Sequence, residues 1–81
     1  MSLDDIYQRL TELLREVFND DSIVARPDLT ADQVAGWDSF AYLRVIFTVE
    51  RAFGINFAAS EITSLKNVGE LAQLIDAKVN A

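Results

Sequence analysis

The chain has 81 residues, a formal net charge of −6 and a hydrophobic fraction of 51%, which suits one small packed domain, residues 1–81, and leaves no room for a second. It contains no cysteine and no histidine, so disulfides, thiolate nucleophiles, Cys/His metal centres and Ser-His-Asp triads are excluded. We expect no nucleic acid partner, because too few bases are present to neutralise a row of phosphates.

The acidic charge is concentrated in the first half of the chain. Residues 1–38 carry nine acidic and three basic residues, whereas residues 39–81 carry four of each. No apolar run approaches the length of a membrane span, and the amino terminus lacks the pattern of a signal peptide. We therefore expect a soluble, cytoplasmic protein and, for a domain of this kind, a monomer.

The first predicted helix covers residues 3–18, where apolar residues recur at steps of three and four from Leu3 to Phe18. Ser2 is a suitable N-cap, and Asp5 lies in the first turn, where acids are favoured. The helix should end in residues 19–22, Asn-Asp-Asp-Ser, whose side chains compete for backbone hydrogen bonds.

A long loop is predicted from about residue 19 to residue 38, punctuated by Pro27 and Gly36. A loop of this length in a small domain needs anchoring. We expect it to lie over the core, with one helical turn within residues 30–34, and to be held by five apolar side chains: Ile23, Val24, Leu29, Val34 and Trp37.

The second predicted helix covers residues 39–53, and Gly54 beyond it is a natural C-terminal stop. Its apolar face is expected to consist of Phe40, Leu43, Ile46, Phe47 and Phe53.

The remaining helices are a short one near residues 59–65 and a terminal one that begins at Asn67. Asn67 and Glu70 fit the spacing of a capping box. The terminal helix should bury Val68, Leu71, Leu74, Ile75 and Val79. The fold class is therefore all-α, a small four-helix bundle with three longer helices, one short helix and a long first loop.

The acidic residues at positions 20–22 raise the question of a calcium loop, because hard cations favour clustered oxygen ligands. Counted from Asp20, the fifth and sixth positions are Val24 and Ala25, where an EF-hand needs an oxygen ligand and a glycine. A solvated turn explains the segment better, and we predict no metal site. No acid pair stands out for acid/base catalysis either, so we predict no enzyme.

Ser39 opens the second predicted helix and directly follows Asp38. A serine at a helix start is usually a cap, but Asp38 is an equally good one. If Asp38 caps the helix, the Ser39 hydroxyl is free to point outward. A phosphodiester on that hydroxyl would lie at the positive end of the helix, beside free N–H groups.

Several segments together resemble the acyl carrier protein family. They are Gly-Trp-Asp-Ser-Phe at residues 36–40, Val-Glu-Arg-Ala-Phe-Gly-Ile at residues 49–55 and Asn-Val-Gly-Glu-Leu at residues 67–71. The resemblance covers almost the whole chain in family order. It implies a carrier bundle that holds no active site of its own.

By this resemblance, Ser39 would receive 4′-phosphopantetheine from coenzyme A through a phosphopantetheinyl transferase, with magnesium assisting the transfer. Asp38 would help position the site, Phe40 stands where the family most often has leucine, and Trp37 would anchor the loop. The arm would supply the thiol that the chain lacks, and acyl-loading and acyl-transfer enzymes would be the other partners.

One departure from the family concerns charge. Family members of housekeeping fatty acid synthesis have a strongly acidic second helix, whereas residues 39–53 here contain two arginines and one glutamate. We expect Phe40, Leu43, Arg44 and Arg51 to contact partners, and we expect a specialised stand-alone carrier of a polyketide, lipid-modification or polysaccharide pathway. Two alternatives stay open: an aminoacyl or peptidyl carrier of a nonribosomal pathway, and an interaction domain without an arm.

Overall fold

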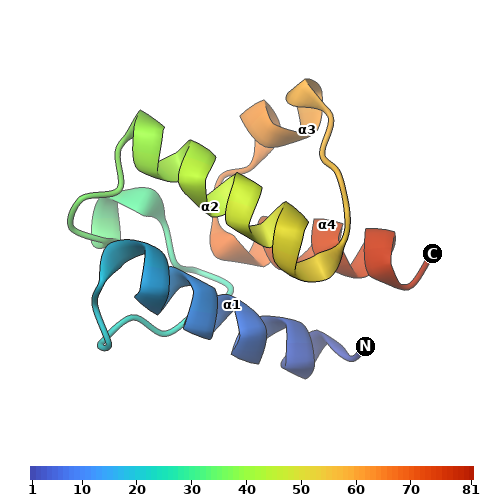
Figure 1. Ribbon diagram of the computed structural model, residues 1–81, viewed down its shortest axis with the longest axis horizontal. Helices are drawn as coiled ribbons and strands as arrows, with labels where there is room; N and C mark the ends of the chain where they lie inside the picture. Colours follow the sequence, from blue (N-terminus) through green and yellow to red (C-terminus); the bar gives the residue numbers. More distant parts are fainter.

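The computed structural model describes residues 1–81 and contains four α-helices, one short 3-10 turn and no strand (Figure 1). The helices are α1 (Leu3–Phe18), α2 (Ser39–Phe53), α3 (Ala59–Ser64) and α4 (Val68–Val79), and the 3-10 turn is η1 (Ala31–Gln33). This confirms the predicted all-α bundle with three longer helices and one short one. The bounds of the first two helices agree with the prediction, and α3 ends one residue earlier than expected.

The core lies where α1 packs against α2 and α4 (Figure 1). All buried side chains are apolar, and no buried side-chain nitrogen or oxygen lacks a hydrogen-bond partner. Burial of such residues is the main stabilising contribution in a domain without disulfides. The largest fully buried side chains are Ile6, Leu10, Leu14, Ile46, Ile75, Val45 and Val49.

Both ends of α1 form as predicted. Ser2 Oγ accepts a hydrogen bond from Asp5 N at 3.1 Å, and Asp5 Oδ2 accepts one from Ser2 N at 3.4 Å, which makes a capping box. Asn19 ends the helix in the left-handed region with a φ of 50°.

The buried face of α2 differs from the predicted one. Of the five residues expected there, only Ile46 is buried, Phe53 is half-buried, and Phe40, Leu43 and Phe47 are exposed by 82%, 42% and 59%. The face that meets the core consists of Ala41, Val45, Ile46 and Val49. Alanine and β-branched residues allow α2 to approach α1 closely, whereas phenylalanine rings at these positions would hold the helices apart.

The long loop lies against the bundle as expected, and Ile23, Leu29 and Val34 are buried. Val24 is half exposed and Ala25 is buried in its place, so the prediction for Val24 is wrong. Burial alternates along residues 23–26, as expected where successive side chains of a segment face the core and the solvent in turn.

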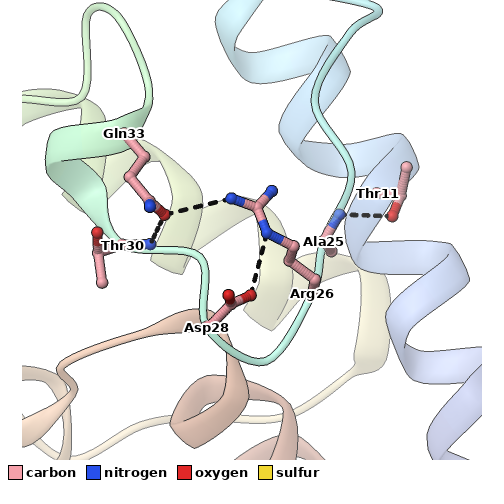
Figure 2. A network of polar contacts seen from close by, with 6 residues as sticks. All are labelled: Thr11, Ala25, Arg26, Asp28, Thr30 and Gln33. Atoms are coloured by element: carbon pink, nitrogen blue, oxygen red, sulfur yellow. Dashed lines mark hydrogen bonds and ion pairs between the residues drawn. The ribbon is translucent and has the colours of Figure 1, made fainter.

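Polar contacts fix the loop along its length (Figure 2). Ala25 N donates to Thr11 Oγ1 of α1 at 2.9 Å. Further along, Arg26 Nε lies 3.0 Å from Asp28 Oδ1, and Gln33 Oε1 accepts from Thr30 N at 3.0 Å. The loop is therefore attached to α1 and also braced within itself.

The loop also accepts hydrogen bonds from the first backbone N–H groups of α4. Val68 N donates to the Leu29 carbonyl at 2.9 Å, and Gly69 N donates to the Pro27 carbonyl at 3.0 Å. A Cβ on Gly69 would lie 2.7 Å from the Pro27 carbonyl oxygen, so only glycine allows this close approach.

The predicted capping box of α4 is only half formed. Asn67 Oδ1 accepts from Glu70 N at 2.8 Å, but Glu70 Oε1 accepts from Lys66 N at 2.9 Å and not from Asn67 N. The helix buries Val68, Leu71, Ala72 and Ile75, whereas Leu74 and Val79 are half-buried.

The two ends of the chain meet. The Met1 amino group lies 3.0 Å from Asn80 Oδ1, and Asn80 Nδ2 donates to the Met1 carbonyl at 2.7 Å. Both termini lie at the same end of the molecule, away from the start of α2 (Figure 1). None of the helices combines the length and the hydropathy needed to cross a membrane.

Candidate functional site

A tight turn leads into α2. Gly36 has a φ of 84°, in the left-handed region that favours glycine, and its carbonyl accepts a hydrogen bond from Asp38 N at 3.0 Å. The turn brings the backbone of Asp38 into the extended conformation of an N-cap residue. The position of the following serine is therefore set by local backbone geometry.

Asp38, and not Ser39, caps α2. Its Oδ1 accepts a hydrogen bond from Ala41 N at 2.9 Å, while its backbone carbonyl accepts the one from Tyr42 N. The Oδ2 atom accepts no hydrogen bond from the protein. This arrangement confirms the prediction that Asp38 takes the capping role, and it releases the Ser39 hydroxyl from that role.

Ser39 is the first residue of α2, and it is exposed. Its hydroxyl makes no hydrogen bond with the protein. The backbone N–H groups of Ser39 and Phe40 also have no acceptor in the chain, so two free donors lie beside the hydroxyl at the positive end of a 15-residue helix. An anionic group attached here would be electrostatically favoured.

Trp37 is half-buried and stacks on Phe18 at the end of α1, with ring centroids 5.1 Å apart and an interplanar angle of 29°. This contact anchors the turn to the body of the bundle, as predicted for Trp37. The indole also lines a shallow, mainly apolar cavity of about 60 Å³, together with Leu29, Tyr42, Leu65, Val68 and Leu71.

One face of α2 carries exposed residues at steps of three and four, and it lies opposite the face that meets the core. We call this face the outer stripe; it consists of Phe40, Leu43, Arg44, Phe47 and Arg51. The four residues predicted to contact partners therefore share one exposed surface, next to Ser39. Phe47 belongs to it too, although the sequence assigned this residue to the core.

Comparison with known proteins agrees with this geometry. The chain matches the family model described as "Phosphopantetheine attachment site" over residues 8–75. It is also similar to the solution NMR structure of the holo acyl carrier protein from Geobacter metallireducens, with a TM-score of 0.87 and 40% sequence identity over 91% of this chain and 85% of that one. The chain belongs to the acyl carrier protein family. No curated protein matches the chain.

The carrier's cofactor is therefore covalently attached 4′-phosphopantetheine. The residues at the start of α2 fit it, because they offer an unbonded exposed hydroxyl, two free N–H donors for a phosphodiester and an apolar cavity nearby. When bound, the group supplies a thiol to a chain that has no cysteine.

Phe47 was predicted to lie in the core, and not on the surface, because α2 carries apolar residues on both of its faces. The available signal was the type of apolar residue. Alanine and β-branched residues mark the core face at positions 41, 45, 46 and 49, while the leucine and two of the phenylalanines mark the outer one. Helical periodicity alone does not distinguish these two faces.

Proposed function

We propose that Ser39 is the attachment point of the arm and that the protein carries acyl intermediates as thioesters between partner enzymes. The observation that carries this proposal is the exposed, unbonded Ser39 hydroxyl at the first position of a helix that Asp38 already caps. In this reading the protein is a non-catalytic, monomeric, cytoplasmic carrier.

Modification would join Ser39 Oγ to the phosphorus of 4′-phosphopantetheine and release the nucleotide part of coenzyme A. The hydroxyl proton leaves with the departing phosphate or to solvent. The new phosphodiester would face the free N–H groups of Ser39 and Phe40. The Oδ2 atom of Asp38 is left free to assist the transferase and its magnesium ion.

An acyl cargo is favoured over an aminoacyl cargo by the similarity to an acyl carrier protein at 40% identity. The outer stripe lacks the acids typical of carriers in housekeeping fatty acid synthesis. A specialised polyketide, lipid-modification or polysaccharide pathway is therefore the role we assign. This assignment can be checked directly by testing whether an acyl-loading enzyme or an amino acid-adenylating enzyme charges the holo form.

The attachment site is tested by incubating the apo protein with coenzyme A and a broad-specificity phosphopantetheinyl transferase. Intact mass should rise by one phosphopantetheine group, and Ser39→Ala should abolish the rise. Ser60→Ala is a matched control, because Ser60 is exposed and lies in the first turn of α3 with no hydrogen bond from its hydroxyl. Loading of the Ser39→Ala variant would refute the assignment.

A further inference from the structure

Three apolar side chains of the outer stripe are exposed to solvent. Phe40, Leu43 and Phe47 follow one another at steps of three and four, which aligns them along α2. This spacing is that of the anchors by which a helix enters an apolar groove of another protein. No segment of this chain covers them, so a partner is needed to remove them from water.

The charges on the same face are all positive. Arg44 and Arg51 are exposed, and neither forms an ion pair with an acid of this chain. Glu50, the only acid in α2, borders the stripe, but it is half-buried and its carboxylate accepts a hydrogen bond from Phe57 N at 2.8 Å. The outer stripe therefore presents two cations and no anion.

This pattern contrasts with the rest of the molecule. The net charge of −6 lies within residues 1–38, which form α1, the long loop and the turn before α2. An acidic partner surface would be repelled by that part and attracted to α2 alone, so approach in the wrong orientation is disfavoured. A basic partner surface would be drawn instead to the acidic first half.

We infer that the outer stripe docks into an apolar groove of a partner enzyme whose rim carries carboxylates. Phe47, in the middle of the stripe, is the central anchor, and Arg44 and Arg51 pair with acids of the rim. The inference rests on the proposed function, because the stripe begins beside Ser39 and docking there would bring the arm to the partner's active site.

The partner can be identified by photo-crosslinking with the holo protein. Phe47 is replaced by p-benzoylphenylalanine and the protein is irradiated in an extract of its native source. The same replacement at Gln73, exposed on α4, is the control. The peptide crosslinked through position 47 should come from an apolar groove with aspartates or glutamates at its edge, and equal capture of the same protein from position 73 would contradict the inference.

The dissociation constant for the purified partner then measures how much each part of the outer stripe contributes to binding. Phe47→Ala should raise the dissociation constant at least about tenfold, as expected for a buried aromatic anchor. Arg44→Glu with Arg51→Glu should raise it about tenfold at low salt and less at high salt, and reversing the partner's acids should restore binding. Gln73→Ala should change nothing; an unchanged constant for Phe47→Ala would overturn the inference.

A lipid surface is the alternative occupant that must be excluded. Stripe-dependent cosedimentation with vesicles of phosphatidylglycerol and phosphatidylcholine would overturn docking into a protein groove. Loading of the wild-type protein from coenzyme A distinguishes a failure of the proposed function from a failure of the docking inference. If Ser39 is not loaded, the proposed function fails; if it is loaded but the stripe variants bind the partner normally, only the docking inference fails.

Discussion

At the scale of single residues, Asp38 uses its two carboxylate oxygens differently. Oδ1 caps α2 through Ala41 N, while Oδ2 has no partner in the protein. The same side chain can therefore stabilise the helix and take part in modification of Ser39. Substitutions that keep or remove the cap separate these contributions.

Asp38→Ala should lower the free energy of unfolding by about 1 kcal/mol, the usual effect of losing an N-cap side chain. Asp38→Asn should leave it nearly unchanged, because asparagine caps equally well. Denaturant unfolding of both variants measures the cap. Slower phosphopantetheine loading of Asp38→Asn, with stability intact, would show that the charge itself assists the transferase; loading at the wild-type rate would limit Asp38 to capping.

At the scale of elements, the features predictable from the sequence are those set by interactions between residues close together in the chain. The bounds of α2 follow from Asp38 and from Gly54, which has a φ of 67°, and both act through their immediate neighbours. The candidate site was predictable for the same reason, since the competition between Asp38 and Ser39 for the cap is decided within a few residues.

Local interactions do not determine which face of α2 is buried or which side chains of the long loop face the core. Phe47 is apolar but exposed, because it lies on the face of α2 opposite the one that meets the core. Val24 is exposed because Ala25 N bonds to Thr11 Oγ1, fourteen residues away, and this contact fixes which side chains of the loop face inward. Such long-range contacts leave no periodic signal in the sequence.

The short helix α3 is held by few contacts. Tyr42 Oη donates to the Ile62 carbonyl, and Lys78 Nζ lies 3.1 Å from Glu61 Oε1 and 5.7 Å from the centre of the Phe57 ring. These contacts join α3 and the segment before it to α2 and α4. Burial raises the pKa of Tyr42, in keeping with its position between α2 and α3.

Tyr42→Phe should lower the free energy of unfolding by about 1 kcal/mol, because the hydroxyl contributes one hydrogen bond and its loss leaves a carbonyl unpaired. Amide exchange should speed up in α3 more than in α1. Tyr7→Phe is the control, since the Tyr7 hydroxyl makes no hydrogen bond in the structure. Equal effects of the two substitutions would show that the Tyr42 contact does not hold α3.

At the scale of the whole molecule, two acids link stability to pH. Hydrogen bonds from Ser22 lower the pKa of Asp20, and the Ala58 N–H, followed by Lys78, lowers the pKa of Glu61. A carboxyl group whose pKa is lower in the folded state stabilises the fold above its ordinary pKa. That stabilisation is lost as the pH falls through the folded-state pKa.

Glu61→Gln should therefore weaken the fall in stability as the pH is lowered from about 5 to 3, because the variant has no carboxylate to protonate there. Denaturant unfolding at a series of pH values measures this slope. Glu16→Gln is a control, since Glu16 is exposed and forms no hydrogen bond or ion pair through its side chain. A slope for Glu61→Gln equal to that of the wild type would contradict the prediction.

The contact between Met1 and Asn80 has a practical consequence for studying transfer reactions. Both ends of the chain lie together, at the opposite end of the long axis from the start of α2 (Figure 1). A fusion partner, a surface tether or a fluorescent label at either end would thus sit away from Ser39. The carrier can be immobilised by one end while its serine remains open to enzymes in solution.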